Sequence, residues 1–273
     1  MEQVKIFLAA HKKAPQYGDS CYQFIHVGAA NSAVMIDGAL RDDASADNIS
    51  QKNDIYCELT GLYYIWKHVH DVEITGLGHY RRLLANQRFA KHPNDQILTQ
   101  QEIVTCLKTH DIILPTLQDK GGQRHGYFRT VEERGEFCPY RLVVPVIKEL
   151  YPEYVDDFDK EFLTPEMSFA NMLICRKELF DEYCEWLFNI LFRVEENLKH
   201  SIYGVAPREM GYFSEWLLNV WVRHKKLEVC YKPIFFIEDN INWHYQVKYA
   251  MQQMGLANQV AKIERYITRK KNL

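Results

Sequence analysis

The chain has 273 residues, of which 47% are apolar and 25% are charged, as in a folded globular protein rather than a disordered one. Its formal net charge of −3 argues against a nucleic-acid partner, which would need a basic surface. The first residues turn polar too soon for a signal peptide, and no uncharged apolar run is long enough to span a membrane. We therefore expect a cytoplasmic protein.

Cysteine and tyrosine content adds two expectations. The seven cysteines are odd in number, contain no Cys-x-x-Cys pair and fall mostly in apolar runs, which favours free thiols in a reducing compartment. The 17 tyrosines suit sugar binding, because each offers a flat apolar face and a polar tip, although a tyrosine-rich core would look the same.

The first half of the chain alternates short apolar runs with helical patterns. In order, we expect strands at 4–9 and 22–27, a polar loop at 38–53, a helix from Asn53 or Asp54 to about His68, a strand at 73–79, a helix at 99–108 and a strand at 111–114. This alternation predicts an α/β fold with a mostly parallel sheet flanked by helices.

The second half opens with a long polar stretch, 118–136, which is rich in glycine and basic residues and is typical of a functional flap. We then expect a helix at 139–150, a strand at 169–175, a helix to about 198, a helix from Pro207 to about 225, a strand at 227–237 and a tail helix from about 257. These elements predict one domain over residues 1–240 and a C-terminal helical extension over 241–273.

The segment from His79 to Arg82 is the sharpest local feature, and we place the centre of the active site at residues 76–82. In open α/β sheets, ligands lie beyond the carboxyl ends of the strands. Two adjacent arginines there can bind phosphate oxygens through their planar forks. Spacing alone also allows a solvated basic turn.

A polar cluster precedes the helix expected from residue 53. Short polar side chains at a helix start can hold an anion or a sugar hydroxyl, but the residues alone favour a well-capped helix with a solvated loop. Asp42 and Asp43 could bind a metal, although no second carboxylate cluster has ligand spacing. The cluster comprises Asp42, Asp43, Asp47, Asn48, Ser50 and Asn53.

Glu215 lies in the helix expected after Pro207, among apolar neighbours. A buried glutamate can have its pKa raised into the working range of a general base. A structural ion pair with Arg208 or Arg223 is the alternative. The motifs of dinucleotide-binding enzymes, P-loop ATPases, α/β hydrolases and zincins are all absent from the sequence.

Read together, several segments resemble a bacterial family of capsular and exopolysaccharide synthesis proteins whose shared domain was long labelled as of unknown function. The similarity runs over roughly residues 3–240. The most specific part is Glu58-Leu59-Thr60-Gly61-Leu62 with Trp66 and Lys67, followed by His79 to Arg82. Tyr64 and Trp216 depart from the family pattern, which usually has Trp and Arg there. The segments are 47–53, 56–67, 76–82, 111–115, 171–174 and 208–215.

The resemblance implies a GT-A-like, Rossmann-type fold and glycosyl transfer from a nucleotide-sugar, with galactofuranose in some members. The usual GT-A enzymes bind a divalent metal through Asp-x-Asp after a strand, whereas this strand end carries His79 to Arg82. We therefore expect arginine charge in place of a metal cofactor, with Mn or Mg as the less favoured alternative.

On that basis we assign roles. We expect an inverting hexosyl transfer from a UDP-sugar to an oligosaccharide or lipid-linked acceptor of a surface polysaccharide. Glu215 is the expected base, with Asp43 and Glu209 as alternatives. The expected site comprises catalytic Glu215, Arg81, Arg82 and His79; donor-binding Asn48, Ser50, Asn53, Asp43 and Tyr80; and acceptor-binding Asn171, Arg208 and Glu209.

Three alternatives stay open. The tail from residue 257 is basic and amphipathic, so it could lie on the inner face of the plasma membrane or could be a solvated helix. The protein could be a non-catalytic nucleotide- or sugar-binding module. It could also be a metal-dependent phosphohydrolase built on His79, Asp42 and Asp43.

Overall fold

The structure is a computed structural model that describes residues 2–86, 93–119, 139–200 and 205–237. The C-terminal extension expected over 241–273 and nearly all of the flap expected over 118–136 lie outside the described residues. Within them, no helix is long and apolar enough to cross a membrane.

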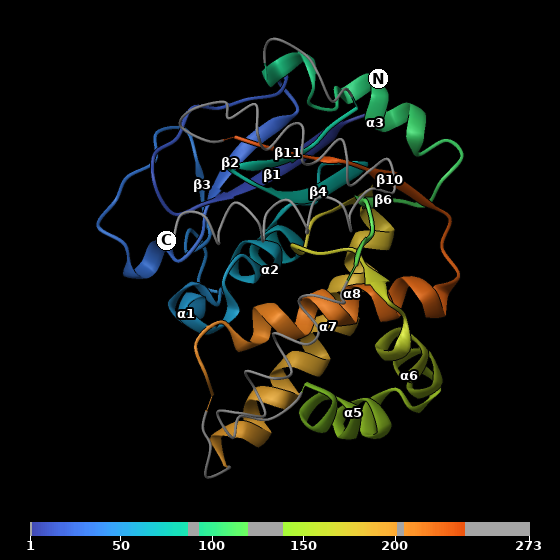
Figure 1. Cartoon of the computed structure of the whole chain (residues 1–273). Coiled ribbons are helices and arrows are strands. Elements are labelled where there is room, and N and C mark those ends of the chain that lie inside the picture. The colour runs from blue at the N-terminus through green and yellow to red at the C-terminus, as the bar shows by residue number, and fades with distance from the viewer. Residues whose placement is uncertain (1, 87–92, 120–138, 201–204, 238–273) are drawn as a thin grey trace, which may run out of the picture.

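A central sheet organises the chain and confirms the expected mostly parallel α/β fold (Figure 1). Its strand order is β10-β6-β9-β4-β1-β2-β3. The pairs β1–β2, β1–β4, β2–β3 and β6–β10 are parallel. The strands are β1 Val4–Ala10, β2 Tyr22–His26, β3 Leu40–Arg41, β4 Ile74–His79, β6 Ile112–Pro115, β9 Leu173–Arg176 and β10 Val229–Lys232.

Strand β9 is reversed and pairs antiparallel with both β4 and β6. Leu77 near the end of β4 stands opposite Leu173 at the start of β9. The segment that enters β9 therefore reaches the same edge of the sheet as His79, where β4 ends. This reversal is what brings residues 170–171 to the expected site.

Two further strands extend the sheet at that edge. Strand β5 (Arg82–Leu84) folds back antiparallel on β4, and β11 (Ile234–Phe236) pairs antiparallel with β5. A short separate ribbon joins β7 (Gln118–Asp119) to β8 (Glu166–Met167).

Helices cover both faces of the sheet. In Figure 1, α2, α7 and α8 lie beneath it, α5 and α6 lie further from it, and α3 lies on the opposite side. The helices are α1 Asn53–Tyr56, α2 Leu59–His68, α3 Gln100–Cys106, α5 Pro139–Leu150, α6 Val155–Leu163, α7 Lys177–Lys199 and α8 Glu209–Lys225, with short 3-10 turns η1 Ala29–Asn31, η2 Ser50–Lys52, η3 Pro93–Asp95 and η4 Pro152–Tyr154.

Strand β1 contributes side chains to the hydrophobic cores on both faces of the sheet. Its side chains alternate across the sheet, as in any strand, so Phe7 and Ala9 join the core between the sheet and helices α2, α7 and α8. Ile6 and Leu8 join the core on the face that carries α3. Because both faces are covered, the strand reads as an unbroken apolar run rather than an alternating one.

Two expected elements are broken in the structure. The helix expected from residue 53 to 68 is interrupted at Cys57, whose φ of 51° is left-handed. The strand expected over 227–237 is split between β10 and β11 at Pro233, which has no N–H for a continuous ladder. Helix α6 and strands β3, β5, β7 and β8 were not expected.

Candidate active site

A strained turn at Ala170 and Asn171 forms the centre of the site. Both residues have left-handed backbones, with φ of 79° and 50°. Neither is glycine, so each conformation costs free energy that the surroundings must offset. Strain of this kind persists where neighbouring groups hold it firmly, and it is common at ligand-binding and catalytic sites.

The side chain of Asn171 is fully hydrogen-bonded by the helical layer. Its amide nitrogen Nδ2 donates to Glu58 Oε1 over 2.7 Å and to the carbonyl of Gly211 over 2.9 Å. Its oxygen Oδ1 accepts from the Ser214 hydroxyl over 2.8 Å. Asn171 was expected to contact the acceptor; with only 3% of its surface exposed, it is placed to shape the site from within.

The backbone of Ala170 links two of the four expected catalytic residues, Glu215 and His79. Its N–H donates to Glu215 Oε1 over 3.0 Å, and its carbonyl lies 2.7 Å from Nε2 of His79. Because a carbonyl can only accept, the His79 ring must carry its proton on Nε2. The other nitrogen, Nδ1, is the one left to meet a ligand. The structure thus brings His79, Asn171 and Glu215 together around one turn.

Glu215 is partly buried on α8, and its pKa is raised to about 7. Burial is the largest cause, and the negative charge of Glu58 is the second. The Ala170 amide and the positive charges of Arg82 and Arg208 act in the opposite direction. A carboxylate with a pKa near neutrality is suited to taking up a proton during a reaction at physiological pH.

Two exposed arginines flank Glu215. Arg82 begins β5, and its guanidinium lies 5.9 Å from the centre of the Phe236 ring. Arg208 precedes α8 and lies 5.5 Å from the centre of the Tyr212 ring. Neither makes a salt bridge with a carboxylate in the described part of the chain. Their charge is therefore available to an anionic ligand.

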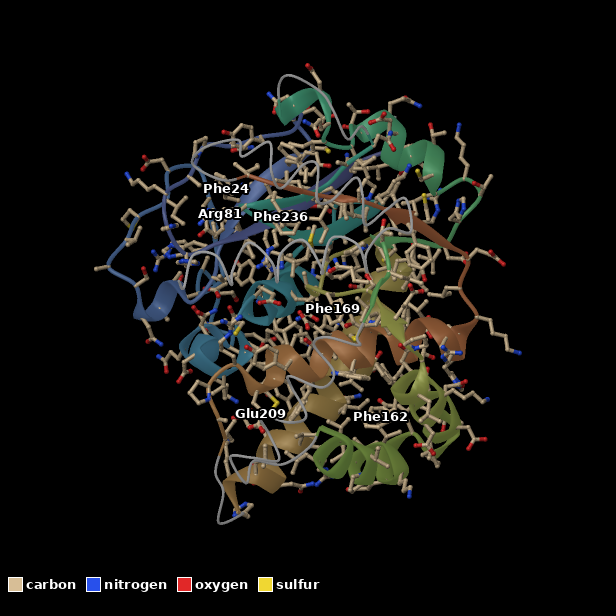
Figure 2. The ribbon with its side chains drawn as sticks, viewed as in Figure 1. Phe24, Arg81, Phe162, Phe169, Glu209 and Phe236 are labelled. Atoms are coloured by element: carbon tan, nitrogen blue, oxygen red, sulfur yellow. The ribbon has the colours of Figure 1, made fainter. Side chains whose placement is uncertain are left out.

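Arg81 and Tyr80 form the turn between β4 and β5 but face other partners. Arg81 Nε donates to the carbonyl of Ile237 over 3.2 Å, and Figure 2 shows Arg81 and Phe236 in the same region at the sheet edge. The Tyr80 ring packs edge-on against His11, with Lys12 above it. Their expected catalytic and donor-binding roles stay predictions.

The expected donor-binding residues form a second cluster organised by Asp42. This buried carboxylate accepts from the N–H groups of Gly28 and Ala29 and from the Ser50 hydroxyl. Asn48 bonds the backbone of residues 45 and 50, and Asn53 bonds the carbonyl of Cys57. Each of these side chains therefore has at least one internal partner, so these residues shape the loop; contact with a donor stays a prediction.

Asp43 and Glu209 were the alternative bases. Asp43 forms a two-point ion pair with Arg41, with atoms 2.7 and 2.9 Å apart, and this hydrogen bonding lowers its pKa. Glu209 Oε2 accepts from the N–H of Ala206 at the start of α8. Figure 2 shows Glu209 well below the sheet edge that carries Arg81. Glu215 has the environment that best suits a base.

No group of three His, Cys, Asp or Glu side chains in the described ranges is arranged to hold a metal ion. Asp42 and Asp43, considered for a phosphohydrolase site, are engaged by backbone amides, Ser50 and Arg41. The six cysteines that the structure describes are free.

Glu58 is the site residue that sequence reasoning missed. It lies in the most specific matching segment, but no role was assigned to it there. The left-handed Cys57 ends α1 just before it, and the Glu58 carboxylate meets Asn171. Its position at the start of that matching segment was the available signal.

The family described as "Domain of unknown function (DUF4422)" matches residues 5–226. The chain belongs to that family. No curated protein matches the chain.

Among solved structures, the chain is similar to one described as "WbbM bifunctional glycosytransferase apo structure", with a TM-score of 0.75 and 28% sequence identity. The alignment covers 87% of this chain and 46% of the other, so the chain spans about half the length of that protein. The likeness supports the expected GT-A-like fold class.

Proposed function

We propose that the protein is a glycosyltransferase that moves a hexose from a UDP-sugar to a growing, lipid-linked surface polysaccharide. The family membership and the likeness to a bifunctional glycosyltransferase support the reaction class. Galactose and galactofuranose are the first sugars to test, on the basis of the resemblance. The polysaccharide would be a capsule, an exopolysaccharide or an O-antigen.

The observation that carries the proposal is Glu215 at the sheet edge with a pKa of about 7, beside exposed Arg82. In an inverting displacement, the Glu215 carboxylate takes the proton of the acceptor hydroxyl. The acceptor oxygen then forms a bond to the anomeric carbon. The bond from that carbon to the diphosphate oxygen breaks, and UDP leaves with the electron pair.

The leaving diphosphate gains negative charge in the transition state. Preorganised positive groups directed at such charge are often the largest contribution to catalysis. Arg82 supplies one such positive group from β5, and Arg208 supplies a second from the position before α8. In this proposal these arginines take the place of a divalent metal, so chelation leaves the rate unchanged.

A panel of nucleotide-sugars tests the proposal through transfer to a saccharide acceptor, donor hydrolysis and thermal shift, each with and without EDTA. We expect one UDP-hexose to stabilise the protein and to be turned over without metal. Arg82→Ala should lower kcat/KM by about 100-fold, the loss seen when one charge-stabilising group is removed. Arg193→Ala is the matched control, because Arg193 is an exposed arginine on α7 that pairs with Glu149.

The outcomes separate the alternatives. If no nucleotide-sugar shifts the melting temperature and Arg82→Ala changes nothing, the proposal fails. Binding without turnover, unaffected by Glu215→Gln, would instead indicate a non-catalytic binding module. Loss of activity in EDTA would refute the metal-free mechanism.

A further inference from the structure

Glu58 has no role in the transfer chemistry described so far, yet it contacts the centre of the site. It is partly buried between the left-handed Cys57 and the start of α2. Its Oε1 accepts from Asn171 over 2.7 Å. Placing a carboxylate so close to the base is unfavourable for both charges, so a carboxylate at this position needs a reason.

A short chain of contacts connects Glu58 to Glu215. Glu58 and the Gly211 carbonyl share the two N–H groups of the Asn171 amide. Asn171 is bonded covalently to Ala170, whose N–H donates to Glu215. Glu58 therefore helps to hold a strained turn in the conformation that directs an amide at the base.

The second connection is electrostatic. Three charged groups and one hydrogen-bond donor act on the Glu215 carboxylate: Glu58 before α2, Arg82 on β5, Arg208 before α8, and the backbone amide of Ala170 before β9. His79 on β4 approaches through the Ala170 carbonyl. Glu58 is the negative member of this set and works against both arginines.

We propose that Glu58 is a positioning residue that fixes the 170–171 turn through Asn171 and, by its charge, keeps Glu215 able to accept a proton beside two arginines. This role depends on the proposed function, in which Glu215 is the base. Without Glu58, the arginines needed for the diphosphate would make Glu215 a weaker base. The site thereby keeps cationic groups and a proton acceptor in the same place.

Two substitutions separate the charge from the hydrogen bond. Glu58→Gln removes the charge but leaves an oxygen that accepts from Asn171. Glu58→Ala removes both. Glu185→Gln is the matched control, because Glu185 is an exposed glutamate on α7.

Two readouts are measured on the full chain. One is the pH dependence of kcat/KM with the UDP-hexose found in the donor panel. The other is the titration of the Glu215 carboxyl by NMR of protein carrying ¹³C-labelled glutamate, with Glu215→Gln identifying its resonance. The NMR titration needs no substrate.

In Glu58→Gln we expect the Glu215 titration and the acid limb of the rate profile to move together, down by about one pH unit. In Glu58→Ala we expect a further fall of kcat, by about tenfold relative to Glu58→Gln, because the turn is no longer held. Glu185→Gln should match the wild type in both readouts.

An unmoved Glu215 titration in Glu58→Gln would overturn the charge role. Equal kcat in the Gln and Ala variants would overturn the positioning role. Failure of the proposed function looks different: no nucleotide-sugar is turned over, while the NMR titration of Glu215 still responds to Glu58→Gln.

Discussion

Replacing the proposed base with its neutral isostere should make the protein more stable as well as inactive. The pKa of Glu215 rises from 4.5 to about 7 on folding, mainly because the carboxylate is buried and faces Glu58. One pH unit corresponds to about 1.4 kcal/mol, so the ionised group destabilises the fold by about 3 kcal/mol as an upper value. Glu215→Gln removes this charge and keeps an oxygen for the Ala170 amide.

The sign of the effect fixes its pH dependence. Between pH 4.5 and 7 the folded protein holds a proton on Glu215 that the unfolded chain has already lost. The free energy of unfolding of the wild type therefore falls as pH rises through this window. The Gln variant has no such proton. Its gain in the free energy of unfolding over the wild type is therefore absent at pH 4 and complete above pH 8.

The difference in stability between Glu215→Gln and the wild type is measured by thermal unfolding at pH 4, 6 and 8, monitored by circular dichroism. For a protein of this size, about 3 kcal/mol corresponds to a rise in Tm of roughly 6–10 °C at pH 8, with no rise at pH 4. Glu185→Gln should show no pH-dependent difference. A constant Tm difference at all three pH values, or a less stable variant at pH 8, would refute the reasoning.

Three further outcomes follow from other sites. In urea unfolding, Glu195→Gln should lower the free energy of unfolding by about 1–3 kcal/mol at pH 7 and by less at pH 4. Burial would raise the pKa of the Glu195 carboxyl, but hydrogen bonds from Lys52, Tyr56 and Lys199 lower it. The stabilisation by the ionised carboxylate is therefore lost as the pH falls. Arg82→Lys should recover only part of the kcat/KM lost in Arg82→Ala, because an ammonium cannot bind a diphosphate with two parallel hydrogen bonds; full recovery would argue for a simple point charge. Gly76→Ala should abolish soluble expression, because its Cβ would lie 2.3 Å from the carbonyl of Leu173; a well-folded variant would mean that β4 and β9 can separate at little cost.

Much of the fold could be predicted because its signals are local. Apolar runs such as that around Phe7 indicate buried strands, and the Thr99 capping box indicates the start of α3, where the Thr99 side chain and Glu102 bond each other's backbone. The direction of β9 could not be predicted, since strand order and orientation depend on long-range pairing. The break at Cys57 also escaped prediction, because its left-handed backbone is held by Asn53 and by the packing of Gly211.

The site divides in the same way. Glu215 was found from its apolar neighbours, because burial among them is what raises the pKa of a carboxylate. Glu58 was not, since its partner Asn171 is 113 residues away. The cluster around Ser50 illustrates the opposite case. The residues alone favoured a capped helix with a solvated loop, the family resemblance indicated donor binding, and the structure shows that many of their bonds are internal.

One face of α8 explains why the strained turn persists. At intervals of about one turn, α8 presents the Gly211 carbonyl with Ser214, then Glu215, then Asn219, and all of them bond the segment 168–171. These bonds tie the entry to β9 to the helix along its length, so relaxing the two left-handed residues would leave several buried polar groups unpaired. The same bonds hold Glu215 near a second carboxylate, where its charge costs stability. We infer that the hydrogen bonds of Asn219 and Ser214 stabilise this segment and so offset the free energy that the Glu215 charge costs.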